Sequence, residues 1–278
     1  MTCAPLCRQP VVFVSHGAPD ICLQPGSTGT TWAELGRLWP RPSAILVISA
    51  HWATAELTVG VAETLATLHD FGGFPKALRE IRYPAPGSPW LAGRVRDLLA
   101  ASSPAHMAVR FDAVRGLDHG AWVPLRFMYP QADIPVCQLS IHPHAGPAWH
   151  RRLGQALAPL RDEGVLILAS GGLTHNFDWL ARDPAPLHPG ASAFADWVAN
   201  ALAIHAEAEL LAYRSVAPYG QTAHPSEEHL MPLFVAWGSS MPGDTLVRLN
   251  QTFTYAALAM DVMLWQASAS GLDSTDRE

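Results

Sequence analysis

Four histidines in this chain each follow a short apolar run by only a few residues. They are His16, His51, His142 and His175, which come after residues 11–14, 44–48, 136–141 and 165–169. Continuous apolar runs of this length are typical of strands that are buried on both faces of a sheet. In open α/β sheets, ligands bind in the crevice beyond the carboxyl ends of the strands, and several imidazoles gathered there could bind a transition metal. The spacing therefore predicts an enzyme with a metal site at this edge of the sheet.

Of these four, His16 and His51 are the best candidates for metal ligands. Gly17 follows His16 and allows the chain to turn sharply or to approach a ligand closely. Either histidine alone would be interpreted as a hydrogen-bonded structural residue, but their matched positions favour metal ligation. His142 is followed by Pro143 and a further histidine, which indicates an exposed loop, so we predict a structural or surface role for it.

His175 is separated from its strand by two glycines, Gly171 and Gly172, which indicate a tight turn that a ligand can approach. The unperturbed pKa of histidine is about 6.5, which suits proton transfer near neutral pH. The same ring could instead bind a metal, and the sequence leaves both roles open. His119 follows Asp118 and either hydrogen-bonds a substrate oxygen or begins a helix that Asp118 caps.

A further cluster runs from His224 to His229 and contains two carboxylates, Glu227 and Glu228. We expect Ser226 or His224 to cap a helix that begins here, with both carboxylates in its first turn, where the helix dipole favours them. The carboxylates are then either a solvated helix start or part of a site. Apolar neighbours predict burial for His229, and a buried imidazole needs a partner.

Strand-like and helix-like segments alternate along the chain. The candidate strands are residues 11–15, 44–49, 57–61, 107–111, 136–141 and 165–170, and the candidate helices are residues 32–38, 88–101, 122–129, 149–160, 191–212 and 226–237. A final strand–helix pair is expected at 246–249 and 255–265. This alternation predicts an α/β fold with a central, largely parallel or mixed sheet flanked by helices. We expect one catalytic domain over residues 8–267 and a frayed polar tail over residues 268–278.

Composition limits the classes of partner. The net charge is −6, from 18 basic and 24 acidic residues, and no basic block occurs, so neither nucleic acid nor an anionic membrane surface is an expected partner. Four cysteines without a C-x-x-C pair do not suggest a disulfide framework. No signal-peptide pattern and no apolar run of about 18 residues is present. We therefore expect a soluble cytoplasmic protein, and the sequence does not set its oligomeric state.

Several short motifs occur together in a fixed order. They are Ser15-His16-Gly17-Ala18-Pro19, Ser49-Ala50-His51-Trp52, Asp70-Phe71-Gly72-Gly73-Phe74-Pro75, Tyr83-Pro84-Ala85-Pro86-Gly87, Asp118-His119-Gly120, Gly172-Leu173-Thr174-His175-Asn176 and His224-Pro225-Ser226-Glu227-Glu228-His229. This set resembles the DODA-type extradiol aromatic ring-opening dioxygenases, which belong to the class III extradiol group with the catalytic subunit of protocatechuate 4,5-dioxygenase. The resemblance runs from about residue 11 to about residue 265.

The resemblance implies a single α/β domain with one divalent metal ion, Zn²⁺ or Fe²⁺, and a small catechol substrate that is opened by O₂. It further implies that His16, His51 and His229 are the metal ligands, that His175 is the acid/base residue, and that His119 lines the substrate and oxygen pocket. His224 and Glu228 are alternative third ligands or partners of the ligands, and Glu227 could also supply a carboxylate. Candidates for aromatic pocket walls are Phe71, Phe74, Trp52 and Trp122.

The identity of the metal separates two hypotheses. Three neutral imidazoles suit Zn²⁺, but Zn²⁺ has no accessible redox change, so Fe²⁺ is expected for oxygen chemistry. The leading hypothesis is an extradiol dioxygenase acting on a catechol such as DOPA or caffeate. The alternative is a zinc hydrolase on the same scaffold, in which a metal-bound water is the nucleophile and Glu227, Glu228 or His175 is the base. A third hypothesis, a non-catalytic binding protein, is disfavoured by the full histidine set.

Overall fold

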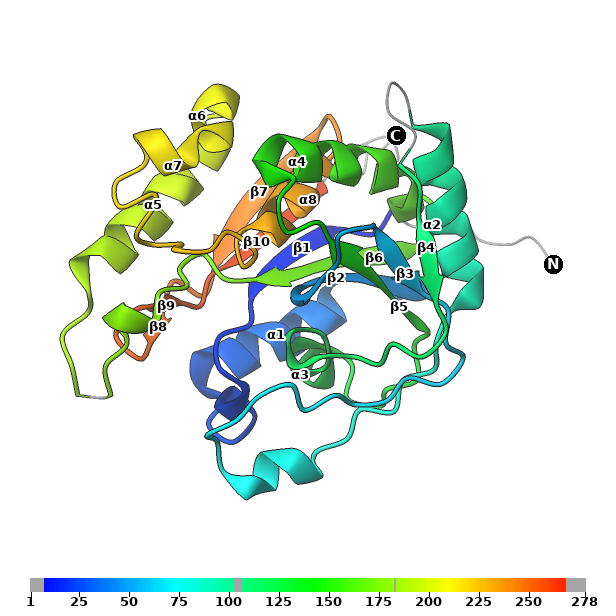
Figure 1. Ribbon diagram of the computed structural model, residues 1–278, viewed down its shortest axis with the longest axis horizontal. Helices are drawn as coiled ribbons and strands as arrows, with labels where there is room; N and C mark the ends of the chain where they lie inside the picture. The colour runs from blue at the N-terminus through cyan, green and yellow to red at the C-terminus, as the bar shows by residue number, and fades with distance from the viewer. Residues whose placement is uncertain (1–7, 103–106, 183, 269–278) are drawn as a thin grey trace, which may run out of the picture.

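Strands that are buried on both faces form the centre of this protein, as the continuous apolar runs predict. The computed structural model describes residues 8–102, 107–182 and 184–268. Eight strands form one mixed sheet in the order β4-β3-β5-β2-β6-β1-β10-β7 (Figure 1). Their bounds are β1 Val11–Ser15, β2 Ala44–Ala53, β3 Thr58–Gly60, β4 Arg110–Asp112, β5 Val136–Ile141, β6 Val165–Gly171, β7 Asp244–Leu249 and β10 Val262–Ala267. A separate two-stranded ribbon consists of β8 Phe253–Thr254 and β9 Leu258–Ala259.

The middle of the sheet is parallel and its margins are mixed. Strands β5, β2, β6 and β1 run in the same direction. Antiparallel pairs join β3 to β5, β10 to β1 and β7 to β10. The prediction of a single α/β domain with a central mixed sheet is therefore confirmed. Because four adjacent strands are parallel, their carboxyl ends open on the same edge of the sheet.

Helices cover both faces of the sheet. Their bounds are α1 Gly26–Leu38, α2 Pro89–Ala101, α3 His119–Met128, α4 Gly146–Leu157, α5 Pro189–Ala203, α6 Glu207–Leu211, α7 Tyr213–Val216 and α8 Met231–Gly238. Four short 3-10 helices are η1 Pro19–Cys22, η2 Lys76–Glu80, η3 Ala158–Arg161 and η4 Phe177–Trp179. Helices α1 and α3 lie against one face, and α2, α4 and α8 lie against the other (Figure 1).

The side chains of β1 show why the apolar runs are continuous. Val11 and Phe13 belong to the core beneath α2, α4 and α8, whereas Val12 and Val14 belong to the core beneath α1 and α3. Successive residues of a strand point to opposite faces, so both sets of positions must be apolar. The predicted helix cap at Asp118 is present and accepts a hydrogen bond from the third residue of α3, and Ser88 caps α2 in the same way.

Several predicted elements differ from the structure. The predicted helix over residues 255–265 is wrong, because residues 262–267 form β10, the antiparallel partner of β1. The predicted helix over residues 191–212 is broken into α5 and α6, with His205 at a φ of 57° between them, and α7 follows beyond the predicted range. No helix begins at Ser226; α8 starts only at Met231, so Glu227 and Glu228 lie in turns before it.

The boundaries of most other predicted elements shift by a few residues, whereas β1 and β5 coincide with their predicted ranges. The strand expected at 107–111 is β4 at Arg110–Asp112, and the helix expected at 32–38 begins earlier as α1. Apart from Ser268, the predicted polar tail lies outside the described residues. Within the described ranges, no helix combines the length and the apolar character that a membrane crossing requires.

Candidate metal centre and active-site cavity

Three adjacent parallel strands bring histidines to one edge of the sheet. His16 directly follows β1, His51 lies near the end of β2, and His175 follows β6 through a short turn. Strand β6 pairs with both β1 and β2, so all three strand ends are neighbours. His142 follows β5 on the far side of β2, but its ring contacts His144 and Trp149 and lines a separate depression of about 360 Å³.

His229 reaches the same place from the turn before α8. The backbone N–H of Gly172 donates a hydrogen bond of 2.9 Å to the carbonyl oxygen of His229. Gly171 packs so closely on this carbonyl that an added Cβ atom would lie 2.1 Å from the oxygen. A side chain at position 171 would therefore push His229 away from the end of β6, which explains why a glycine is needed there.

The Nε2 atoms of three imidazoles meet at one point. His51 Nε2 lies 3.0 Å from His16 Nε2 and 3.3 Å from His229 Nε2. Two nitrogens that are each bound about 2.1 Å from one ion lie about 3.0 Å apart at a right angle and about 3.4 Å apart at the tetrahedral angle. The separations therefore fit three ligands of a single divalent ion, and these three residues form one group of potential ligands.

The outer nitrogens of two of these rings have defined hydrogen-bond partners. Ser170 Oγ donates its proton to the carbonyl of Gly120 at 2.5 Å, so it must accept the proton of His16 Nδ1 at 2.9 Å. Glu228 Oε1 accepts a hydrogen bond from His229 Nδ1 at 3.0 Å. A proton on Nδ1 leaves the lone pair on Nε2, so these partners hold both rings in the tautomer that can bind a metal.

Burial keeps these imidazoles neutral. Burial, reinforced by the neighbouring histidines, lowers the pKa of His16 and of His229 well below the usual value. Burial also lowers the pKa of His51 to about 4. The hydrogen bond from His229 lowers the pKa of Glu228 to about 2, so this side chain is a carboxylate at neutral pH. Neutral imidazoles are the form of histidine that binds a metal ion.

His175 lies directly against this group of ligands. Its ring stacks on that of His229, with centroids 3.5 Å apart and planes inclined by 7°. Burial lowers the pKa of His175, and the nearby Glu228 partly opposes this effect. Neither ring nitrogen of His175 makes a hydrogen bond to any residue that the structure describes, and the ring lines the cavity. It is therefore free to exchange a proton with a bound molecule.

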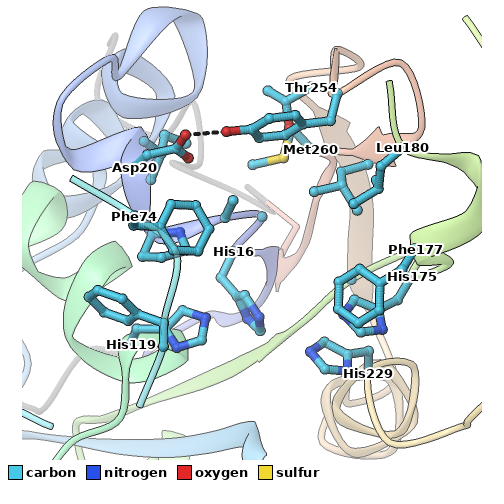
Figure 2. Close-up of a pocket in the computed structure, with 18 of the residues that line it drawn as sticks. His16, Asp20, Phe74, His119, His175, Phe177, Leu180, His229, Thr254 and Met260 are labelled. Atoms are coloured by element: carbon cyan, nitrogen blue, oxygen red, sulfur yellow. Dashed lines mark hydrogen bonds between the residues drawn. The ribbon is translucent and has the colours of Figure 1, made fainter. Parts of the chain in front are cut away.

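A cavity of about 750 Å³ opens over the histidines. Figure 2 shows the histidine rings on one side of it and Asp20 and Thr254 on the other. Its apolar lining includes Phe71, Phe74, Phe177, Leu180 and Met260. Of the four aromatic residues predicted as pocket walls, Phe71 and Phe74 line the cavity, whereas Trp122 packs behind Phe71 and Trp52 lies beneath the guanidinium of Arg115. The volume suits a small aromatic molecule.

His119 is the first residue of α3, and its side chain lines the cavity. Its Nδ1 atom lies 3.0 Å from Asp70 Oδ1. Burial raises the pKa of Asp70, but hydrogen bonds from the side chain and the backbone of His119 outweigh this effect and lower that pKa to about 2. Asp70 is thus an anion that holds one side of the His119 ring.

The remaining predicted site residues point elsewhere. His224 is fully buried, and its Nε2 atom donates to the carbonyl of Leu173 at 2.9 Å. Glu227 accepts a hydrogen bond of 2.8 Å from the hydroxyl of Tyr213. Among the described residues, neither side chain belongs to a group of potential metal ligands. Of the candidates for a third ligand, His229 is the one that forms a group of potential ligands with His16 and His51 among the described residues, and Glu228 contacts its outer nitrogen.

Sequence reasoning assigned no role to Ser170 or Asp70. Ser170 directly follows the apolar run at residues 165–169, where a serine indicates only that the strand is ending. Asp70 stands before the aromatic loop at 71–74, and its spacing from His119 gives no signal of contact. The contacts of both residues with the site histidines become visible only in the folded structure, which brings distant segments together.

Comparison with known proteins agrees with this geometry. Residues 8–259 match the family described as the catalytic LigB subunit of aromatic ring-opening dioxygenase. A protein of Beta vulgaris named "4,5-DOPA dioxygenase extradiol" is 46% identical over 231 residues, which cover 82% of this chain and 85% of that protein. A protein of the same name from Escherichia coli K12 is 41% identical over 84% of this chain and 85% of its own length.

A solved structure shows the same architecture. It is that of an uncharacterised protein from Escherichia coli K12, with a TM-score of 0.76, 34% sequence identity, and coverage of 92% of this chain and 99% of that one. The family match does not favour the hydrolase hypothesis, because it extends over the strands and turns that carry the histidine cluster. The chain belongs to the LigB family, the catalytic subunits of aromatic ring-opening dioxygenases, and is an extradiol dioxygenase that requires a divalent metal.

Proposed function

We propose that this enzyme opens the ring of a catechol beside one of its hydroxyl groups, with a DOPA-like or caffeate-like molecule as the substrate. The names of the beet and Escherichia coli relatives support a DOPA-like substrate. The apolar walls and the volume of the cavity suit a single aromatic ring with a short side chain. The histidines at one end supply the chemistry, and the rest of the cavity accommodates the side chain.

The proposed metal ligands are His16, His51 and His229, through their Nε2 atoms. Ser170 and Glu228 support this assignment because they hold the outer nitrogens of two of the rings. When bound, Fe²⁺ would supply the exchange of electrons between catechol and O₂, which Zn²⁺ cannot supply because it has no accessible redox change. We therefore propose Fe²⁺ as the catalytic ion, and the arrangement of neutral imidazoles accommodates either ion.

We propose that His175 is the general acid and base. Its lowered pKa leaves the imidazole neutral at pH 7, so it can accept a proton from a catechol hydroxyl. The resulting imidazolium can return that proton to an oxygen atom of the opening ring. Stacking on His229 fixes the His175 ring beside the ligand group, so the proton moves over a short and defined path. His119 also lines the cavity, and we propose that it faces the bound substrate and O₂.

One observation carries this proposal: three Nε2 atoms converge, and a fourth imidazole with free nitrogens lies in stacking contact with one of them. The test is an oxygen-electrode assay with a panel of catechols, after anaerobic removal of metal and reloading with Fe²⁺ or Zn²⁺. Elemental analysis of the loaded protein should give one ion per chain. Oxygen uptake and a coloured ring-opened product are expected with Fe²⁺ only.

Variants of two histidines provide a matched comparison. His175→Ala should retain one Fe²⁺ per chain and lose oxygen uptake by several orders of magnitude, because the general base is missing. His142→Ala removes a histidine that also follows a parallel strand but lies outside the cluster, and it should keep both metal and activity. Equal turnover by the two variants would contradict the proposed role of His175. Turnover without O₂ in the zinc-loaded enzyme would instead support the hydrolase hypothesis.

A further inference from the structure

Asp70 lies between a proposed metal ligand and the histidine on the pocket wall. Its Oδ1 atom is 3.0 Å from His119 Nδ1, and its Oδ2 atom is 3.7 Å from His51 Nδ1. The rings of His51 and His119 are themselves in contact, with centroids 4.0 Å apart. One carboxylate thus faces two catalytic-site imidazoles through its two different oxygens.

The position of this carboxylate is fixed by the start of α3. The backbone N–H of His119 donates a second hydrogen bond, of 2.9 Å, to Asp70 Oδ1. The N–H groups in the first turn of a helix have no partner within the helix, and an anion is favoured there. Just before Asp70, the backbone N–H of Leu68 donates to the carbonyl of Leu117, and the carbonyl of Leu68 accepts a hydrogen bond from the indole of Trp122. These bonds tie the segment that carries Asp70 to α3.

The contact with Asp70 decides which nitrogen of His119 carries the proton. A carboxylate can only accept, so the short Oδ1–Nδ1 contact requires a proton on His119 Nδ1. In the neutral ring, Nε2 then carries the lone pair. Within the described part of the chain, Nε2 makes no hydrogen bond, and the ring lines the cavity.

We propose that Asp70 is a positioning residue that fixes His119 as the Nδ1–H tautomer, so that Nε2 faces the cavity as a hydrogen-bond acceptor for a hydroxyl of the substrate. The part of the inference that concerns the substrate rests on the proposed function. The part that concerns the tautomer does not.

The tautomer can be observed without any turnover. In protein labelled with ¹⁵N-histidine, two-bond ¹H–¹⁵N correlation spectra report which ring nitrogen carries the proton. The spectra would be recorded on metal-free protein and on the diamagnetic zinc form, and His119→Gln would identify the signals of His119. We expect a proton on Nδ1 alone in both forms. A proton on Nε2 alone, or protons on both nitrogens, would overturn the inference whether or not the enzyme opens catechols.

Asp70→Asn keeps the size of the side chain and removes its charge. Its amide can present an N–H to His119 and so release the tautomer, because a donor and an acceptor are then equally available. We expect mixed tautomers of His119 in the spectra and a loss of kcat/KM of about 10- to 100-fold, by analogy with the loss when a hydrogen-bond partner of a metal-ligating histidine is removed. Asp112→Asn is the matched control, because Asp112 accepts two backbone hydrogen bonds and contacts none of the site histidines.

A double-mutant comparison separates positioning from a general structural effect. If Asp70 acts through His119, then Asp70→Asn should change kcat/KM little in a His119→Gln background, because the ring that it orients is absent. Additive losses in the double variant would show that Asp70 acts independently of His119 and would overturn the proposal. Thermal unfolding of each variant would show that it is folded. Absence of any catechol turnover in the wild type would refute the proposed function alone and leave the tautomer result standing.

Discussion

The hydroxyl of Ser170 should control how tightly the protein binds its metal ion. Ser170 is fully buried, donates to the carbonyl of Gly120 and accepts from His16 Nδ1. In Ser170→Ala, the Nδ1–H group of His16 loses its acceptor, and the ring is no longer held in one tautomer and orientation. We therefore expect weaker metal binding at an unchanged number of ligands.

The size of this effect follows from comparable contacts. Removing the hydrogen-bond partner of a ligating histidine typically costs 10- to 100-fold in metal affinity, which corresponds to about 1.4 to 2.8 kcal/mol. The carbonyl of Gly120 also loses its donor, and a buried unsatisfied acceptor costs about 1–3 kcal/mol of folding free energy. The metal-free variant should therefore also unfold at lower denaturant concentration than the metal-free wild type.

The assay is a competition titration with a chromophoric chelator, using Zn²⁺ to avoid oxidation, together with urea unfolding of the metal-free protein. Ser140→Ala is a matched control, since Ser140 is also a fully buried serine of the sheet and hydrogen-bonds Thr54 and Thr58 rather than a histidine. The control should lose stability and keep its metal affinity. A folded Ser170→Ala protein with wild-type metal affinity would refute the reasoning about the His16 tautomer.

Three other outcomes can be measured by unfolding experiments. The side chain of Arg161 is wholly buried and pairs with that of Asp244, which is also buried, so Arg161→Met should lower the free energy of unfolding by about 3–5 kcal/mol. As a control, Arg8→Met removes an exposed ion pair and should lower it by at most about 1 kcal/mol. Equal losses of unfolding free energy in the two variants would contradict the importance of burial. Burial lowers the pKa of His150 to about 4, so between pH 6.5 and 4 the unfolded chain binds more protons than the folded chain. The contribution of His150 to the free energy of unfolding is complete above pH 6.5 and should fall by about 1.4 kcal/mol per pH unit below it. His150→Gln should lack this slope in urea titrations. Chelation of the metal should lower the melting temperature, and free Zn²⁺ at 100 times its Kd should restore about 2.7 kcal/mol of unfolding free energy. His16→Ala should respond much less to chelator and to Zn²⁺. A wild-type melting temperature that does not change with chelator would contradict metal binding by the folded state.

The centre of the sheet was predictable because both faces of its strands are buried. Strands β1 and β5 coincide with the predicted ranges, and the bounds of β2 and β6 differ only at their carboxyl ends. The prediction of a helix over residues 255–265 is wrong because an apolar run alone does not indicate whether a distant strand will pair with it. There the structure has a tight turn with positive φ at Tyr255 and Ala256, followed by a strand that pairs with β1 from the other end of the chain.

The part of the candidate site that lies at the ends of the parallel strands was predictable from the sequence, as these strands were. Matched positions after parallel strands pointed to His16 and His51, and the glycine pair pointed to His175. Local sequence left the choice among His229, His224 and the glutamates open, because it depends on how the turns before α8 pack on Gly171. The contacts of Asp70 with His51 and His119 join segments that no spacing relates, so only the folded chain reveals them.

The insertion of β10 beside β1 has a consequence for biosynthesis. Strand β1 pairs with β6 on one side and with β10 on the other, so its edge toward β10 stays unpaired until residues 262–267 have been synthesised. Contacts between such distant segments slow folding, and open strand edges invite association between nascent chains. His16 and His229 are likewise far apart in the sequence, so we expect the ion to bind only after His229 has been synthesised and has packed on Gly171. Overexpression in cells depleted of iron and zinc should yield more aggregated product.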